Sequence, residues 1–228
     1  MIYIFGDSHV RSFSHIENII PLFIGSGSKT NLRNIKVIIN KINEIVDLGI
    51  IKPDDITILY FGEPDCRHQL GYGLYPHYVD IVHKKIRIVD EVVNKSFLND
   101  CCNKYVELIS KLKITPYILS VTSAYPSVIP AMVYMNNKLK EDNIDIFIDI
   151  FSKTIDNDGN IKSEFISSDF NKDPLHLNSR VRDVLIKTLV IKKIIKSSDV
   201  TKNDTIFDSY DVRDNFKKDS RFGCYVLK

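Results

Sequence analysis

The chain has 228 residues, of which 44% are hydrophobic and 26% are charged, so it can bury the core of a single large α/β domain. This composition excludes disordered, collagen-like and disulfide-scaffold proteins. The formal net charge is +2, from 31 basic and 29 acidic residues, which gives no reason to expect nucleic-acid or membrane-surface binding.

No apolar run reaches the ~18 residues that a membrane-spanning helix needs, and the first residues lack the pattern of a secretory signal. The four cysteines include the adjacent pair Cys101 and Cys102, and their spacing suits neither a disulfide framework nor a zinc site. We therefore expect an intracellular, cytoplasmic protein that neither spans nor binds a membrane.

Short apolar runs alternate with helical patterns along the chain. The runs typical of buried strands are 2–5, 19–24, 56–61, 117–122 and 144–150. The predicted helical segments are 32–45, 78–113, 129–142 and 179–195, and a Gly/Tyr/Pro-rich loop is expected over 71–77. This alternation predicts a three-layer α/β sandwich with a central parallel sheet of five strands.

The pattern changes near the C-terminus. We expect residues 1–196 to form the α/β domain and residues 197–228 to form a C-terminal extension. The extension is rich in Asp, Lys and Ser but carries five aromatic residues, so full disorder is not expected. It should pack on the domain or on a second subunit, and the latter would make the protein a homo-oligomer.

Residues with catalytic potential follow the predicted strands, where open parallel sheets bind ligands. In chain order these segments are Gly6-Asp7-Ser8-His9, Gly25-Ser26-Gly27-Ser28, Gly62-Glu63-Pro64-Asp65-Cys66-Arg67-His68 and, before the last helix, Asp173-Pro174-Leu175-His176. Each has an ordinary structural explanation when taken singly: Ser8 as a helix N-cap, Asp173 with Pro174 as a helix start, and the glycines as a tight turn.

Together the segments favour acyl-transfer chemistry. A serine hydroxyl becomes a nucleophile when a base removes its proton and a third group orients that base. His176 and Asp173 provide base and orienting carboxylate from one segment, if that segment reaches Ser8. Backbone N–H groups of Ser8 and of a glycine in the second segment would then face the developing oxyanion.

The segments resemble the conserved blocks of the SGNH (GDSL-type) hydrolase superfamily. Gly6-Asp7-Ser8 matches the first block, with Ser8 as nucleophile, and Asp173-Pro174-Leu175-His176 matches the last block, D-x-x-H. The resemblance implies an SGNH/flavodoxin-like fold and assigns the oxyanion glycine of the second block to Gly27, with Gly25 as the alternative. The third block, normally G-x-N-D, reads Gly62-Glu63-Pro64-Asp65 here and is similar to a G-E-x-D-C-R variant found in SGNH-like proteins associated with glycan modification.

The third block also departs from the family. The family's asparagine donates a side-chain hydrogen bond to the oxyanion, and Pro64 in its place can donate none. Losing one such donor typically costs about 2.7 to 4 kcal/mol. Arg67 is a candidate substitute that would bind the oxyanion or an anionic part of the substrate. Alternatively, Arg67 pairs with Glu63 or Asp65 and only fixes this segment.

The resemblance implies a serine-dependent esterase or O-acyltransferase that acts on an ester-linked acyl group, above all O-acetyl on a carbohydrate. Ser8 would attack the acyl carbon, His176 would take its proton, and Asp173 would hold the imidazole. Gly25 or Gly27, Gly62, Glu63, Asp65 and Arg67 are the expected oxyanion and substrate-binding residues. The substrate is an acylated small molecule or glycan, and neither a metal nor an organic cofactor is expected.

Other functions stay open. Asp7 and His9 resemble the opening D-x-H motif of metal-dependent phosphoesterases, in which both would bind metal, but the later motifs of that class are missing from the sequence. A glycan-binding module that keeps the fold without a working oxyanion hole is a further alternative. Cys66 is flanked by Asp65 and Arg67, yet no base is placed for it, and the resemblance makes it a packing residue.

Overall fold

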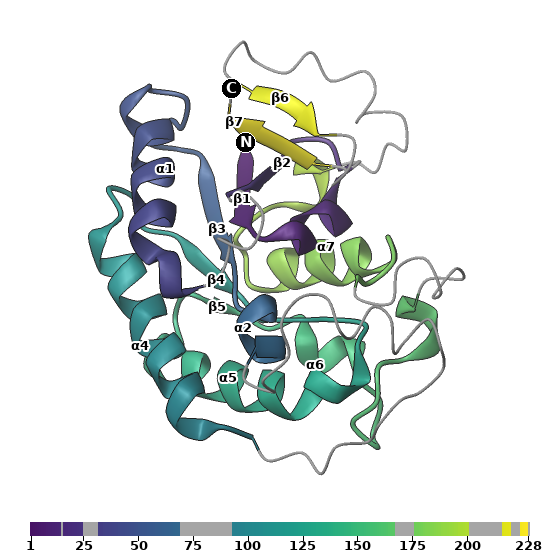
Figure 1. The fold of residues 1–228 in the computed structure, drawn as a ribbon. Helices are drawn as coiled ribbons and strands as arrows, with labels where there is room; N and C mark the ends of the chain where they lie inside the picture. The colour runs from purple at the N-terminus through teal and green to yellow at the C-terminus, as the bar shows by residue number, and fades with distance from the viewer. Residues whose placement is uncertain are drawn as a thin grey trace.

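The computed structural model describes residues 1–14, 16–24, 32–68, 93–166, 176–200, 216–219 and 224–227. The protein is α/β, with a mixed, mostly parallel sheet of seven strands in the order β5-β4-β3-β1-β2-β7-β6 (Figure 1). The strands are β1 (Ile2–Gly6), β2 (Ile19–Phe23), β3 (Ile56–Tyr60), β4 (Tyr117–Leu119), β5 (Phe147–Ile148), β6 (Phe216–Asp219) and β7 (Cys224–Leu227).

Both α-helices and 3-10 helices connect the strands. The α-helices are α1 (Ile35–Asp47), α2 (Glu63–His68), α4 (Lys95–Lys111), α5 (Ile129–Asp142), α6 (Phe151–Thr154) and α7 (Val181–Ile191). The 3-10 helices are η1 (Ser8–Phe13), η3 (Leu32–Asn34), η4 (Pro126–Val128), η5 (Ser163–Phe165) and η6 (Ser197–Asp199). In Figure 1, α1 and α4 lie along one side of the strands and α7 lies on the other.

All five strands predicted from apolar runs are present, and neighbours among them pair in parallel. β1 lies between β2 and β3, and all five of its residues are buried. Central parallel strands are covered on both faces, which is why they stand out in the sequence as uninterrupted apolar runs. The last two runs are longer than their strands: β4 has three residues and β5 has two.

The sheet differs from the predicted five-stranded parallel sheet beyond β2. β7 pairs with β2 in parallel, and β6 pairs with β7 antiparallel, so the C-terminal extension adds a hairpin to the sheet. Phe216, Cys224 and Tyr225 of this hairpin are buried, so this part of the extension packs on the domain. Each added strand has only four residues, too few for the alternation of polar and apolar residues to reveal it.

The predicted helices agree with the structure where it describes them. α1 buries one face made of isoleucines: Ile35, Ile38, Ile39, Ile42 and Ile45. α5 has the predicted bounds, and α7 lies within its predicted range. α4 fills the second part of the range 78–113; the remainder of that range, and the loop predicted over 71–77, lie outside the described residues.

The strand order has a switch point at β1. From β1 the chain continues to β2 on one side, and then returns to β3 on the other side of β1. In doubly wound sheets of the order 2-1-3-4-5, ligands bind at this switch point, outside the carboxyl ends of β1 and β3. The segments that follow these two strands begin with Asp7-Ser8-His9 and with Gly62-Glu63.

Of the helices within the described ranges, none is both long enough and apolar enough to cross a bilayer.

Gly6 ends β1 two residues before the candidate nucleophile Ser8 and has no room for a side chain. A Cβ at this position would lie 2.2 Å from the Tyr60 carbonyl oxygen and 2.5 Å from Cγ1 of Val10. We expect Gly6→Ala to lower the free energy of unfolding by about 3 kcal/mol, because backbone of a central strand cannot move aside. Urea denaturation measures this loss.

The matched control is Gly49→Ala, at the C-terminal end of α1. A Cβ on Gly49 meets nothing within 4 Å, and the only cost is its φ of +66°. This strain is worth about 1 kcal/mol. Equal losses of stability in the two variants would contradict the packing argument.

Candidate functional site

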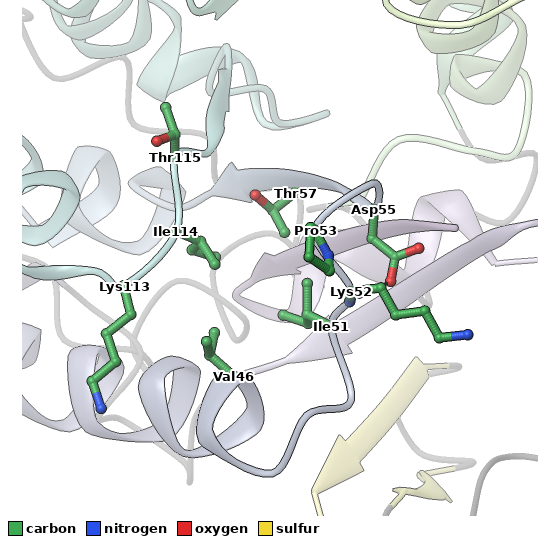
Figure 2. Close-up of a pocket in the computed structure, with 9 residues that line it drawn as sticks. All are labelled: Val46, Ile51, Lys52, Pro53, Asp55, Thr57, Lys113, Ile114 and Thr115. Atoms are coloured by element: carbon green, nitrogen blue, oxygen red, sulfur yellow. Dashed lines mark hydrogen bonds between the residues drawn. The ribbon is translucent and has the colours of Figure 1, made fainter.

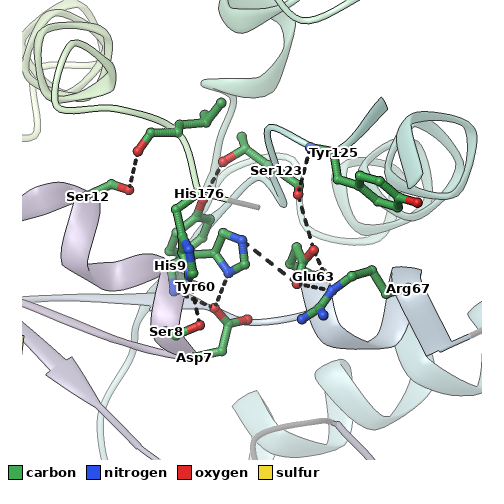
Figure 3. A network of polar contacts seen from close by, with 12 residues as sticks. Asp7, Ser8, His9, Ser12, Tyr60, Glu63, Arg67, Ser123, Tyr125 and His176 are labelled. Atoms are coloured by element: carbon green, nitrogen blue, oxygen red, sulfur yellow. Dashed lines mark hydrogen bonds and ion pairs between the residues drawn. The ribbon is translucent and has the colours of Figure 1, made fainter. Parts of the chain in front are cut away.

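Ser8 and His176 form a hydrogen-bonded pair at the carboxyl edge of the sheet, although 168 positions separate them (Figure 3). Ser8 Oγ lies 3.0 Å from His176 Nε2. Ser8 is the first residue of η1, and both residues are partly buried. A hydroxyl within hydrogen-bonding reach of an imidazole nitrogen is the geometry of a nucleophile and its general base.

Asp7, not Ser8, caps η1. The Asp7 carboxylate accepts a hydrogen bond from the His9 backbone N–H at 2.9 Å. A serine at a strand-to-helix turn commonly fills this capping role. Because the carboxylate fills it here, the Ser8 hydroxyl interacts with His176 instead.

Contacts between η1 and the segment around α7 hold His176 in place. Ser12 Oγ donates a hydrogen bond to the Leu177 carbonyl oxygen at 3.0 Å, and Arg182 Nε donates one to the Ser12 carbonyl oxygen at 3.1 Å. Leu177 is itself buried in the core. One short helix therefore carries the candidate nucleophile and anchors the segment that carries the candidate base.

The surroundings of His176 keep its imidazole neutral. Burial lowers the pKa of His176 well below its usual value of 6.5. The positive charges of His9 and Arg11 lower this pKa further, while the carboxylates nearby act in the opposite direction. A neutral ring at neutral pH is able to accept the proton of Ser8, as a general base must.

His9 lies beside this pair, between two buried carboxylates (Figure 3). Its Nδ1 is 2.9 Å from Asp7 Oδ1, and its Nε2 is 3.8 Å from Glu63 Oε2. Burial disfavours the charged ring, but the attraction of Glu63 and Asp7 outweighs burial and raises the pKa of His9. The ring centroids of His9 and His176 are 4.3 Å apart.

Glu63 and Arg67 reach the same edge from α2. Glu63 is 1% exposed, and Arg67 Nε lies 2.8 and 2.9 Å from its two carboxylate oxygens. Ser123 Oγ donates a further hydrogen bond to Glu63 at 3.2 Å. Burial opposes the charged guanidinium, but Glu63 holds the pKa of Arg67 above its usual value. Of the two roles predicted for Arg67, its contacts correspond to the pairing with Glu63.

The contacts of Asp65 are those of a buried structural residue. It is fully buried, accepts a hydrogen bond from the Leu32 backbone N–H at 3.0 Å, and lies 3.8 Å from Cys101 Sγ. It thereby ties α2 to the start of η3 and to α4. These contacts are structural, and the substrate-binding role expected of Asp65 stays a prediction.

The third segment forms the short helix α2. Pro64 is its second residue, where a helix makes no use of a backbone N–H. Gly62, just before α2, has a φ of +118°, and a Cβ there would lie 2.7 Å from Cε of Met135. Cys66 is buried with its Sγ 3.8 Å from Met135 Sδ, and burial raises its pKa well above the usual value. Cys66 is thus a packing residue.

Three predicted site residues lie outside the described residues: Asp173, Gly25 and Gly27. The orienting carboxylate and the oxyanion glycine therefore stay predictions.

Asp7 and His9, the residues of the metal-dependent alternative, bind each other. The ring nitrogens of His9 face the carboxylates of Asp7 and Glu63. Within the described part of the chain, no three His, Cys, Asp or Glu side chains are grouped as a metal site would require.

Several residues of the site escaped the sequence analysis. The side chains of Ser12 and Arg182 donate hydrogen bonds to backbone carbonyl oxygens, and no sequence motif reveals such contacts. Ser123 follows β4 at the same edge, and the rule that functional residues follow parallel strands could have found it. Tyr60, the last residue of β3, shares a buried hydroxyl hydrogen bond with Thr122, but its place in an apolar run concealed it.

A hollow of about 460 Å³ lies away from this site, at the amino ends of β3 and β4 (Figure 2). Two of its charged side chains are paired: Lys113 Nζ lies 2.6 and 2.7 Å from the Asp47 carboxylate oxygens, and Asp55 lies 2.8 Å from the N-terminal ammonium. The residues labelled in Figure 2 include no histidine or serine that could form a nucleophile with its base. The hollow therefore adds nothing to the chemistry.

Comparison with protein-family models finds no family that matches the chain, and comparison with curated proteins finds no match. The resemblance to SGNH hydrolases consequently rests on the motifs themselves.

Asp65 should make the stability of the protein depend on pH. Burial raises its pKa from 3.8 to about 7, so the folded state binds this proton more tightly than the unfolded state does. The free energy of unfolding should therefore fall as the pH rises from about 4 to about 7. Asp65→Asn keeps an acceptor for Leu32 and removes the charge, so it should be more stable than wild type at pH 8, by up to ~4 kcal/mol.

Urea denaturation between pH 4 and pH 8 checks this expectation. Asp54→Asn, on the surface, is the matched control and should keep the pH dependence of the wild type. If Asp65→Asn is the less stable protein at pH 8, Asp65 contributes to stability as a carboxylate and the argument is wrong.

Proposed function

We propose that the protein is a serine-dependent esterase or O-acyltransferase of the SGNH type, with Ser8 as nucleophile and His176 as general base. The observation that carries this proposal is the 3.0 Å distance between Ser8 Oγ and His176 Nε2, in surroundings that keep the imidazole neutral. The pair also lies at the switch point of the sheet, where folds of this order bind ligands.

The fold proposed with this function is the three-layer, SGNH/flavodoxin-like sandwich. The order β2-β1-β3-β4-β5 of the five consecutive strands supports it. The hairpin of β6 and β7 would then be an addition at the β2 edge.

In the proposed reaction, Ser8 Oγ attacks the acyl carbon while His176 Nε2 takes its proton. The tetrahedral intermediate expels the alcohol, which receives that proton from His176, and the acyl group stays on Ser8 as an ester. Water releases the acyl group, or a sugar hydroxyl accepts it, with His176 again taking a proton from the attacking oxygen. Asp173 would orient the imidazole, and Gly25 or Gly27 would donate to the oxyanion.

The substrate class rests on the third motif. Gly62-Glu63-Pro64-Asp65-Cys66-Arg67 is similar to the variant of SGNH-like proteins associated with glycan modification. We therefore propose an O-acylated carbohydrate, above all an O-acetylated one, as the substrate.

A serine-directed fluorophosphonate should label Ser8 of the wild type. Ser8→Ala should abolish labelling and lower the hydrolysis of p-nitrophenyl acetate by at least ~10³-fold, and His176→Asn should have a similar effect because the two residues act as a unit. Ser14→Ala removes a hydroxyl that only donates to the Arg11 carbonyl oxygen of the same helix, so it should retain both labelling and turnover.

Other outcomes would support the alternatives. Activity that survives Ser8→Ala but is lost with a chelator indicates a metal-dependent phosphoesterase. A folded protein that binds glycans but is neither labelled nor active indicates a binding module.

The pH dependence of turnover should report His176. Because the pKa of this residue lies well below 6.5, the ring stays neutral through neutral pH, and a proton on it blocks catalysis only in acid. We expect kcat/KM for p-nitrophenyl acetate to be flat between pH 7 and pH 8 and to fall at a midpoint below pH 6.5. A midpoint at or above pH 7 would show that the ring is not kept neutral in this way.

A further inference from the structure

The site contains two adjacent imidazoles, and the proposed reaction uses only one of them. His9 is 2% exposed, and its ring is tilted by 36° against the ring of His176 at a centroid distance of 4.3 Å. Its nitrogens face Asp7 and Glu63, so it is placed neither to attack an acyl group nor to take the proton of Ser8.

We propose that His9 is a positioning residue for this reaction: as a buried cation between Asp7 and Glu63, it screens His176 from both carboxylates and supports its ring as a neutral base. This inference rests on the proposed function. It follows from the charged groups that surround His176.

Charged and titratable groups face His9 from several elements. Asp7 comes from the end of β1, Glu63 and Arg67 come from α2, and His176 comes from the segment before α7. The Tyr60 ring of β3 contacts His9 edge-on, at 6.4 Å between centroids. The positive charge of Arg11 in η1 also lowers the pKa of His176.

The balance of these charges depends on His9. Asp7 and Glu63 carry two negative charges, and Arg67 offsets one of them. Without a cation at position 9, Arg11 would be the remaining positive charge that acts on His176 against the carboxylates of Glu63 and Asp7. The less positive surroundings would favour the imidazolium form of His176, which cannot act as a base, and would stabilise the developing oxyanion less.

The fold near His9 does not depend on its imidazole alone. Asp7 caps η1 through the backbone N–H of residue 9, and Glu63 keeps its contacts with Arg67 and Ser123 when the ring is removed. A neutral replacement such as His9→Gln should therefore remain folded and leave the change of charge as its main effect.

The direct test is an NMR titration of the His176 ring, assigned with His176→Asn. In His9→Gln, the titration of His176 should move to higher pH by about one unit or more, the size of effect that a nearby charge produces. In the background of His9→Gln, Glu63→Gln removes a negative charge and there is no His9 cation left to lose. The double variant should therefore titrate at lower pH than His9→Gln, close to the wild type.

The rate of fluorophosphonate labelling of Ser8 is the second readout. The acid limb of labelling should shift in the same direction in each variant, and His9→Gln should regain its labelling rate at alkaline pH, which a merely misfolded site would not do. His9→Lys, which keeps the charge without the ring, should retain the acid limb of the wild type.

The outcomes separate this inference from the proposed function. An unshifted His176 titration in folded His9→Gln overturns the inference alone. If His9→Gln does not fold, an unshifted His176 titration in folded His9→Asn overturns it. Wild-type protein that is not labelled at any pH overturns the proposed function, whatever the titrations show.

Discussion

The hydrogen bond between Ser8 and His176 is the interaction on which the site depends, and the parallel sheet makes it possible. Every parallel strand ends at the same edge, so a turn after β1 and a segment far along the chain meet there. The two segments are then held together by hydrogen bonds from Ser12 Oγ to the Leu177 carbonyl oxygen and from Arg182 Nε to the Ser12 carbonyl oxygen. A hydroxyl and an imidazole held by main-chain contacts lose little freedom on reaching their reactive geometry, which is the condition for efficient proton transfer.

Burial of charge is the second constraint. An isolated carboxylate in a protein interior is costly, and Asp7 and Glu63 are each 1% exposed. Both are compensated locally: Asp7 by a backbone N–H and by His9, Glu63 by Arg67 and Ser123. The same partners that make burial tolerable also set the charge around His176. Stability and reactivity of this edge therefore share one network, and a change to any member should affect both.

The sequence predicts those parts of the structure that depend on local pattern. Continuous apolar runs located β1 to β5, and helical spacing located α1, because burial of a strand or helix face selects residue type at fixed intervals. Motifs also paired Ser8 with His176. The β6–β7 hairpin, α2 and the role of His9 escaped prediction for a common reason. Four-residue strands, a six-residue helix and a buried histidine owe their state to tertiary neighbours, and a single sequence carries no signal for these.

In the proposed SGNH-type site, Pro64 lies where the SGNH family has its oxyanion asparagine. Helix α2 contributes charge compensation through Glu63 and Arg67, and Pro64 supplies no donor for an oxyanion. The proposed catalyst then relies more on proton transfer by His176. A low pKa makes His176 a weaker base but, once protonated, a stronger acid toward the departing oxygen. Sugar alkoxides are poor leaving groups, so efficient protonation of that oxygen is what hydrolysis of a sugar ester needs most. The electrostatics around His176 therefore suit the proposed substrate better than they suit an activated aryl ester.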